Sequence, residues 1–591
     1  MVLELLPSLA WLAVVSFAMG YGLIREKSLM SLAFGLSAFA VLSVVFNLAH
    51  VPLHWAVFLI LSVAILVYLL LRKELSFDIG KPDLALALVI LIALLNLLIY
   101  VSGSNAYPYL EDDDPWVHAV GAKWVAQTMS YSRFFDGAVF TRLYIEPYPP
   151  AYDILMGVLN QMTGSVVDTL KFYNALLIAF TLLCAFYAFS EMTGNRNLSL
   201  LAVFFLACLP SFMSHFIWAQ TLALMFMFCA LYAYERAMKD RRFIIPAGTA
   251  AAAVAVTQPS VAAVFAFISL LYFAVKLHSL GKDAVRPLLI AGAIAIALSS
   301  VYYLPTLVKY GPKYTALGIG MLGNMFGSGS TDDTSGGVVY GLTDFIFAEP
   351  TGKIDQQIGI GIALSVAAAA GLVLAVKERH SWKSEPWLVL SVILLVFCLL
   401  GTEGNALPFK LFPHRFWVFL SVPVALLSAY AILRIDAMMP QKNVLLGMMV
   451  VAVLLTSADA KIKVQTSQWP AGASFTSNEE IAGYLQMKAT LPKGTLVFPL
   501  CSDDSKVIGS DMLSEPYVPE YELFKRTAPD RSTEEIYAFL KGRNYSYLTI
   551  DSTCYSALGS ERTARLVSGL ESSPRFDAAF VNGGFALLKL R

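Results

Sequence analysis

The sequence predicts a polytopic all-α membrane domain followed by a C-terminal extracytoplasmic α/β domain. Composition supports the membrane assignment: of 591 residues, 57% are hydrophobic and 14% charged, and the mean hydropathy is +0.65. Soluble globular proteins carry more charge than this. Apolar runs of about 20 residues, which is enough to cross a bilayer core of about 30 Å, recur from the N-terminus to residue 460. After residue 460 the pattern changes to short helical and strand-like segments.

We predict about 14 membrane spans from these apolar runs. They lie at 5–24, 29–49, 52–71, 83–102, 168–190, 198–214, 216–234, 243–257, 259–275, 287–308, 358–376, 385–401, 415–433 and 443–460. The first span lacks a basic leader and a small-residue cleavage site, so we expect it to be retained.

Lys and Arg indicate how the spans are oriented, because basic residues concentrate in short cytoplasmic loops. With the amino terminus outside, every inner loop carries at least one of them, as at Arg25, Arg72, Arg196, Arg236, Lys276, Lys377 and Arg434. Two long loops, 103–167 and 309–357, and the segment after residue 460 then face the exterior. The protein is therefore expected in a cell membrane as a multi-pass protein.

The chain divides into three parts on this pattern. Residues 1–75 form a three-span unit, 76–460 the larger membrane domain with its two outer loops, and 461–591 the α/β domain. In the last part, GTLVFPL, YSYLTID and FALLKL predict strands, and STEEIYAFLKGR predicts a helix opened by a capping box. Cys501 and Cys554 are the two cysteines outside the spans, and either a disulfide or two free thiols fits their spacing.

The strongest chemical signal is the stretch YLEDDDPWVHAVGAKWV, which follows the span at 83–102. It places four carboxylates side by side: Glu111, Asp112, Asp113 and Asp114. Asp113 or Asp114 can cap a helix that begins at Pro115, but capping needs only one carboxylate. Adjacent carboxylates raise one another's pKa values and commonly serve a cation, a proton transfer or a cationic partner. We therefore favour a functional role at the outer membrane surface.

A helix from Pro115 would place His118 one turn from Asp114 and let Trp116 and Trp124 settle at the lipid interface. The following segment, EPYPPAYDILMGVLNQMTG at 146–164, is too short to cross the membrane, so we expect an interfacial helix. A carboxylate at this surface could act as a general base for an acceptor arriving from outside, while a lipid-borne donor would arrive from the side.

Such a donor needs a phosphate-binding group, and the outer segment LPFKLFPHRFWVF supplies Lys410, His414 and Arg415 at the start of a span. A guanidinium can hold a phosphate there, although basic side chains also snorkel at helix ends with no ligand. Weaker candidates for the same role are Arg142, Lys309 and Lys313. Glu349 could reach the site from the second outer loop.

Other polar residues fit structural roles. His215 and Gln220 lie at a short outer turn, and Glu146 and Asp153 fit helix caps. The chain has no Walker loop, dinucleotide glycine fingerprint or zinc-spaced Cys/His set. Lys plus Arg equals Asp plus Glu at 42 each, so net charge gives no support for a nucleic-acid partner.

The order of these features resembles the GT-C superfamily of integral-membrane glycosyltransferases: a span, an Asp-rich outer loop, an amphipathic helix, a Tyr-Pro-Pro segment, an interfacial helix and about ten more spans. Within it, DDDPWVHA is similar to the Asp-Pro-aromatic opening of oligosaccharyltransferase catalytic subunits, which maps their first-loop aspartate onto Asp114. Two features depart from that family. The C-terminal domain has no Trp-Trp-Asp-Tyr-Gly motif, and the turn at 213–219 has no second acidic pair.

The resemblance implies inverting sugar transfer from a polyprenyl-phosphate donor to a lipid, glycan or protein acceptor. Asp113 or Asp114 would be the base, and Arg415 or Lys410 would stabilise the departing phosphate. The remaining residues implied to contact substrate are Glu111, Asp112, His118, Arg142, Glu349 and His414. Asp112 and Asp114 could instead hold Mg or Mn, or no cofactor is needed.

Three alternatives stay open at this point: a flippase or transporter for lipid-linked glycans, oligosaccharyltransferase-like glycosylation of protein, and a non-catalytic membrane scaffold. A transporter would place ionisable residues along a path in mid-membrane and show internal repeats. The spans here carry few charges, and the acidic cluster lies in a loop.

Overall fold

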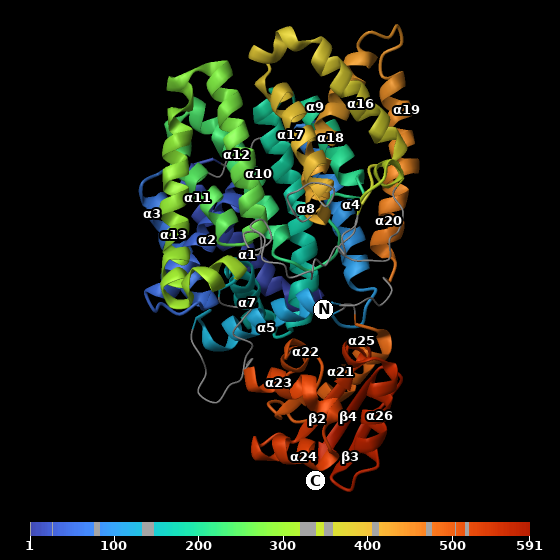
Figure 1. The fold of residues 1–591 in the computed structure, drawn as a ribbon. Coiled ribbons are helices and arrows are strands. Elements are labelled where there is room, and N and C mark those ends of the chain that lie inside the picture. The colour runs from blue at the N-terminus through green and yellow to red at the C-terminus, as the bar shows by residue number, and fades with distance from the viewer. Residues whose placement is uncertain are drawn as a thin grey trace. The chain divides into compact units, whose positions relative to one another are not determined.

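The computed structural model describes residues 2–26, 28–75, 83–110, 112–132, 147–318, 339–347, 358–404, 413–468, 476–502, 504–514 and 519–591. The chain forms two compact units (Figure 1). Unit 1 comprises Met1–Ala106, Tyr148–Tyr152 and Lys171–Trp469; unit 2 comprises Tyr107–Pro147, Asp153–Leu170 and Pro470–Arg591. The sequence assigns the first outer loop to the membrane domain, whereas in the structure most of this loop groups with the C-terminal segment.

Unit 1 is a bundle of long helices. Its elements are α1 (Val2–Ile24), α2 (Leu29–Leu48), α3 (Trp55–Leu71), α4 (Leu84–Ser104), α8 (Val166–Thr193, from Lys171 onward), α9 (Arg196–Cys208), α10 (Gln220–Lys239), η1 (Arg241–Phe243), α11 (Ile244–Ala255), α12 (Pro259–Leu280), α13 (Lys282–Gly318), α15 (Leu342–Ile346), α16 (Ile362–Lys377), η2 (Arg379–Lys383), α17 (Pro386–Thr402), α18 (Pro413–Asp436), α19 (Val444–Val453), the π-helical turn η4 (Leu454–Ala458) and α20 (Asp459–Thr466).

Each predicted span lies on one of these helices. Within the described ranges, eight helices are long and apolar enough to cross a membrane, and α3, α9, α16 and α17 are shorter apolar helices. The chain is thus a multi-pass membrane protein, and the total of about 14 spans stays a prediction. The predicted span at 198–214 ends early, at Cys208, because Leu209 precedes Pro210 and adopts an extended backbone.

Unit 2 joins part of the first outer loop to an α/β domain. The loop contributes α5 (Asp113–Thr128), α7 (Ala151–Thr163, from Asp153 onward) and the first turn of α8. The C-terminal segment contributes α21 (Asn478–Thr490), β1 (Val497–Pro499), α22 (Ser505–Gly509), α23 (Pro519–Thr527), η5 (Ala528–Asp530), α24 (Thr533–Gly542), β2 (Tyr547–Asp551), α25 (Ser552–Leu558), α26 (Ser560–Glu571), β3 (Phe576–Val581) and β4 (Phe585–Leu590).

The strands described in unit 2 form one sheet in the order β1-β2-β4-β3, with β1 parallel to β2 and the other neighbours antiparallel. Its core side chains come from strands and helices together, among them Phe498, Ile536, Leu548, Leu570 and Leu588. The capping box predicted at the start of α24 is confirmed, since Ser532 and Glu535 exchange hydrogen bonds with each other's backbone. The strand β3 is not predicted, because much of FDAAFV faces solvent.

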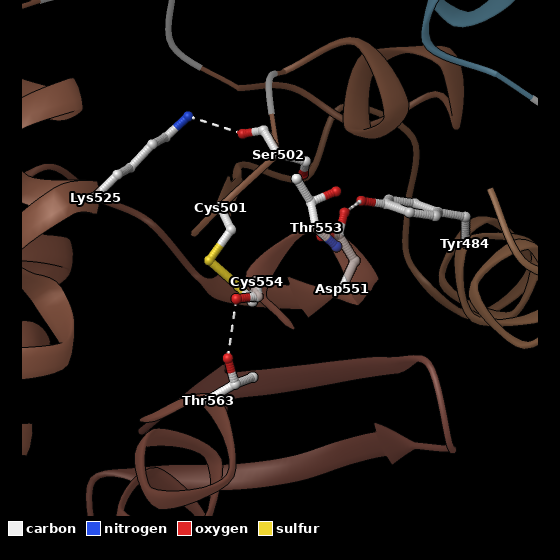
Figure 2. The surroundings of a disulfide bond; sticks show 8 residues. All are labelled: Tyr484, Cys501, Ser502, Lys525, Asp551, Thr553, Cys554 and Thr563. Atoms are coloured by element: carbon white, nitrogen blue, oxygen red, sulfur yellow. Dashed lines mark hydrogen bonds between the residues drawn. A yellow bond between two sulfur atoms is a disulfide. The ribbon is translucent and has the colours of Figure 1, made fainter. Parts of the chain in front are cut away.

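A disulfide joins the chain after β1 to the helix after β2. It links Cys501 to Cys554, with the two Cα atoms 5.0 Å apart (Figure 2). This is the pairing that the sequence leaves as one of two alternatives. The neighbouring Asp551 accepts a hydrogen bond from the Tyr484 hydroxyl at 2.8 Å, so the bridge and this hydrogen bond hold the same end of β2.

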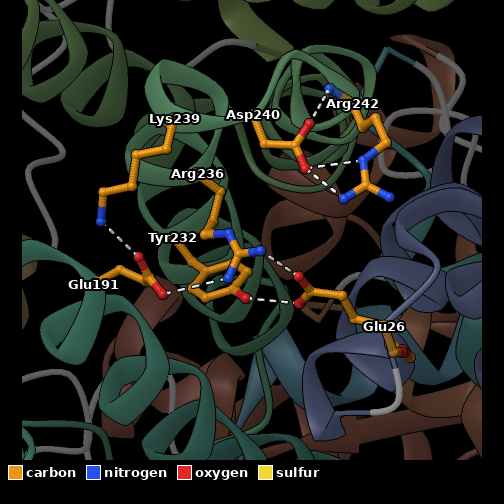
Figure 3. A network of polar contacts seen from close by, with 8 residues as sticks. Glu26, Glu191, Tyr232, Arg236, Lys239, Asp240 and Arg242 are labelled. Atoms are coloured by element: carbon orange, nitrogen blue, oxygen red, sulfur yellow. Dashed lines mark hydrogen bonds and ion pairs between the residues drawn. The ribbon is translucent and has the colours of Figure 1, made fainter.

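A network of charged residues joins helix ends that the positive-inside pattern assigns to one side of the membrane (Figure 3). Arg236 pairs with Glu26 and, at 3.5 Å, with Glu191. Lys239 pairs with Glu191 at 2.9 Å, and Tyr232 donates to Glu26 at 3.0 Å. The ends of α1, α8 and α10 therefore lie together at one end of unit 1, as the predicted alternation of inner and outer loops requires.

Candidate active site

The acidic cluster occupies the cap and first turn of α5. Asp112 is the N-cap, with an extended backbone and a side-chain oxygen that accepts from the Asp114 backbone N–H at 3.3 Å. Asp113 and Asp114 are the first two helical residues. Glu111 and the side chain of Asp113 lie outside the described residues.

The predicted helix start at Pro115 is two residues too late, and the cap is Asp112 rather than Asp113 or Asp114. The first turn of a helix has backbone N–H groups with no intrahelical acceptor, so a proline in its third position removes no helical hydrogen bond. The consequence is chemical: Asp113 and Asp114 lie at the positive end of the helix dipole, which stabilises negative charge.

One face of α5 packs on α7. The Nδ1 atom of His118 lies 2.7 Å from Oδ1 of Asp153, and both side chains are buried. Burial raises the pKa of the Asp153 carboxyl, and the adjacent imidazole offsets this only partly. A Cβ at Gly121 would approach Asp153 Oδ2 to 2.5 Å, so only glycine lets the carboxylate lie this close to the helix.

The sequence places His118 correctly on the helix but misses its partner. Asp153 was expected as a helix cap; it instead lies against the imidazole of another helix. A signal was present, because Asp153 is an acidic residue inside the apolar run AYDILMGVL. A buried carboxylate is rare unless it is paired.

The opposite face of α5 packs on the C-terminal domain. The Trp116 ring lies 5.1 Å from that of Tyr109 and 5.7 Å from that of Tyr484, between ring centroids, and its Nε1 donates to Thr476 at 3.3 Å. Trp116 and Trp124 are both buried in the protein. The prediction that these indoles settle at the lipid interface is wrong, because the C-terminal domain covers Trp116.

Lys123, three turns beyond the cap, joins α5 to the same domain. Its ammonium donates to the carbonyl oxygens of Ile508 at 3.0 Å and Gly509 at 2.8 Å and forms an ion pair with Asp511. Burial lowers the pKa of Lys123 to about 8, although Asp511 raises it in part. Lys123 is not among the residues predicted for the site, although a lysine within the apolar stretch HAVGAKWVA was a signal.

The predicted phosphate-binding group lies in unit 1, in the first turn of α18. Nη1 of Arg415 donates to Oγ of Ser260 at 2.9 Å, and the guanidinium lies over the Trp218 ring at 5.8 Å. Ser260 donates in turn to Gln258, the N-cap of α12. His414 is buried beside Arg415. Side chains of the protein thus hold the Arg415 guanidinium. A basic residue that only snorkels to the membrane surface would not need such contacts. Lys410, Arg142 and Glu349 lie outside the described residues.

The short outer turn before α10 is tied to α20. The backbone N–H of His215 donates to the Gln465 side chain at 2.8 Å, and Lys461 donates to the Phe212 carbonyl at 2.9 Å. Lys461 is almost fully buried, with its ammonium 5.5 Å from the centroid of the Tyr100 ring. His215 is thus a buried, hydrogen-bonded residue, in keeping with its predicted structural role.

Comparison with known proteins identifies the family of this chain. The sequence pattern of a family of unknown function, DUF6541, matches residues 13–499. The chain belongs to the DUF6541 family. No curated protein matches it by sequence.

Solved structures similar to this DUF6541 protein include two membrane enzymes. The oligosaccharyltransferase of Archaeoglobus fulgidus, in its apo form, superimposes with a TM-score of 0.53 at 14% identity, covering 80% of this chain and 70% of its own. ArnT from Cupriavidus metallidurans, in its apo state, gives a TM-score of 0.53 at 11% identity, covering 86% and 98%. These likenesses confirm the predicted fold class, a polytopic helical membrane domain with a C-terminal α/β domain.

Asp112 and Asp114 are the residues predicted to bind a divalent metal ion. In the part of this DUF6541 chain that the structure describes, no group of three or more His, Cys, Asp or Glu side chains could hold a metal ion. Asp112 already accepts a helix N–H, and the positive helix end disfavours a cation. The described residues therefore do not form a metal site, and the Mg or Mn requirement stays a prediction.

Proposed function

We propose that this protein is a GT-C glycosyltransferase that moves a sugar from a polyprenyl-phosphate donor to an acceptor at the outer face of the membrane. The observation that carries the proposal is the position of Asp113 and Asp114, in the first turn of a helix shortly after the span α4. The fold supports it, because the two similar structures named above are GT-C glycosyltransferases.

In the proposed reaction, an acceptor hydroxyl attacks the anomeric carbon of the donor sugar. The new bond joins the acceptor oxygen to that carbon, the bond from the carbon to the phosphate oxygen breaks, and polyprenyl phosphate leaves. The carboxylate of Asp114 or Asp113 takes the acceptor proton. Because attack and departure take place on opposite faces of the sugar, the anomeric configuration inverts.

The other charged residues of the proposed site stabilise the charges that develop on the sugar and on the phosphate during transfer. Positive charge on the sugar is stabilised by carboxylates near it, the role we give to Glu111 and Asp112. Negative charge on the leaving phosphate is stabilised by Arg415, with Lys410 and His414. Ser260 and Trp218 hold the Arg415 guanidinium in place before the donor arrives, which lowers the cost of ordering it. Arg142 and Glu349 are assigned to substrate contact.

The test is transfer from a panel of radiolabelled polyprenyl-phosphate sugars by the full chain in proteoliposomes, with and without EDTA. We expect one donor to be consumed and Asp114→Asn or Asp113→Asn to lower kcat by about 10²-fold or more, the usual contribution of a general base. Asp283→Asn is the matched control, since Asp283 is a carboxylate in the first turn of α13.

Two outcomes would overturn the proposal: no donor is consumed, or both Asp variants equal the wild type. The effect of EDTA decides whether a divalent cation takes part.

Transfer to protein is the second candidate, favoured by the likeness to an oligosaccharyltransferase. Adding an acceptor peptide with an Asn sequon beside a lipid acceptor separates the two. Movement of an intact lipid-linked glycan across the bilayer, with no sugar transferred, would instead identify a flippase.

A further inference from the structure

Residues 504–511, called the clamp below, lie between α5 and the rest of the C-terminal domain. They comprise the short helix α22 and the turn that ends at Asp511. Asp511 has φ +68°, a left-handed conformation that is uncommon for a residue with a side chain. The clamp has one set of contacts with the sheet domain and another with α5.

The first set fixes the clamp to its own domain. Lys506 forms a buried ion pair with Glu480 of α21 at 2.7 Å, and Glu480 also accepts from Ser552 after β2. Asp504 accepts from Ser514 at 2.9 Å. The Cys501–Cys554 disulfide lies a few residues before the clamp (Figure 2). Since these groups are buried or covalent, the clamp moves only with the sheet domain.

The second set of contacts joins the clamp to α5. Lys123 donates to the carbonyls of Ile508 and Gly509 and pairs with Asp511. Trp116 covers Gly509 so closely that a Cβ there would lie 2.5 Å from the indole ring.

Tyr109, just before α5, and Lys488 of α21 add to the same contact. Tyr109, three residues before Asp112, donates to Gly509 O at 3.0 Å, and Lys488 bridges Tyr109, at 3.1 Å, to Asp511, at 3.0 Å.

These contacts determine where the first turn of α5 lies. Asp112, Trp116 and Lys123 are spaced by four and seven residues, so they follow one face of the helix. Tyr109 and Trp116 hold the clamp on either side of the acidic residues, and Lys123 stops the helix sliding along its axis. A helix held at both places cannot shift its N-terminus without breaking a buried ionic contact.

We propose that Lys123 is a positioning residue for sugar transfer: through the clamp, the C-terminal domain sets the position of Asp113 and Asp114. The effect on the rate of sugar transfer rests on the proposed function, whereas the fixing of α5 by the clamp does not. The C-terminal domain then belongs to the catalytic machinery, and a partner that displaced the clamp would change the rate of transfer.

The test compares Lys123→Met and Asp511→Asn with Lys589→Met in the full chain. Lys589 is an exposed lysine of β4 in the same domain, which makes it a matched control. Hydrogen exchange followed by mass spectrometry reports the amides of 112–128 without any substrate. We expect their exchange to rise by about tenfold in both clamp variants and to stay unchanged in the control.

The second readout is transfer kinetics with the donor that the wild type consumes. A helix end displaced by about 1 Å costs about 10²-fold in rate, so kcat should fall while the KM for the donor changes little. Lys123→Arg, which keeps the charge and the donors, should recover most of kcat. A purely structural lysine would lower the amount of folded protein and leave kcat per folded molecule unchanged.

The outcomes separate the two proposals. Unchanged exchange at 112–128 in both variants overturns the clamp, and so does raised exchange with normal kcat. If the wild type transfers no sugar, the proposed function fails and exchange alone decides whether the clamp holds α5. Should Lys123→Met fail to fold, Asp511→Asn, which keeps the size of the side chain, still gives the answer.

Discussion

The two faces of α5 are held in different ways. Toward α7, His118 meets Asp153, a residue 35 positions away in the same outer loop. Toward the clamp, Lys123 meets Asp511, which is 388 positions away, together with two backbone carbonyls. The first contact joins two helices of the same loop, while the second joins the helix to the C-terminal sheet domain. One short helix thus receives its position from near and distant parts of the chain.

The largest effect is expected from breaking the contact with α7. Asp153→Ala leaves the buried His118 without the carboxylate and opens a cavity, and removing one partner of a buried pair costs about 3–5 kcal/mol. We expect a clear fall in the thermal midpoint of the purified chain. Asp153→Asn, which keeps an acceptor for the imidazole, should cost less. Equal midpoints for wild type and Asp153→Ala would show that this contact contributes nothing to stability.

The clamp face can be disturbed without touching a charge. Gly509→Ala places a methyl group against the Trp116 ring, and overpacking of this kind costs about 1–3 kcal/mol. We expect a lower thermal midpoint and a changed tryptophan fluorescence spectrum. Gly542→Ala is the control, since a Cβ there meets nothing within 4 Å. If Gly509→Ala behaves like this control, Trp116 does not pack on the clamp as described.

The charge of Lys123 can be tested by pH. Its folded pKa of about 8 is below the ordinary 10.5, so between these values the unfolded chain binds this proton more tightly. The contribution of Lys123 to the free energy of unfolding therefore rises with pH above 8, by about 2 kcal/mol at pH 9.5. The thermal midpoint of wild type minus that of Lys123→Met should therefore increase from pH 7 to pH 9.5. A constant difference would mean that Lys123 is not buried.

The smallest effect is expected far from α5. Ser532→Ala removes the N-cap of α24 and should destabilise the C-terminal domain by about 1 kcal/mol. Hydrogen exchange at 112–128 should stay as in the wild type, because the cap makes no contact with the clamp. Increased exchange there would mean that general loosening of the domain, rather than the clamp, controls α5.

Local patterns predicted much of the fold. The apolar helices could be located because an apolar run is a property of neighbouring residues, and the capping box of α24 could be predicted from Ser532 and Glu535. The error at the start of α5 was also local: Pro115 suggested the first helical position, but a proline is equally tolerated two positions later.

The sequence by itself determined that this is a multi-pass membrane protein with an acidic helix after the span α4 and a C-terminal α/β domain, because hydropathy, capping and carboxylate clustering act over a few residues. Only the tertiary structure decided that His118 meets Asp153, that Trp116 is buried under the C-terminal domain and that Lys123 reaches Asp511. Each of these contacts joins separate elements of the chain and therefore depends on how those elements pack. No periodicity within one segment specifies which buried charge will neutralise another.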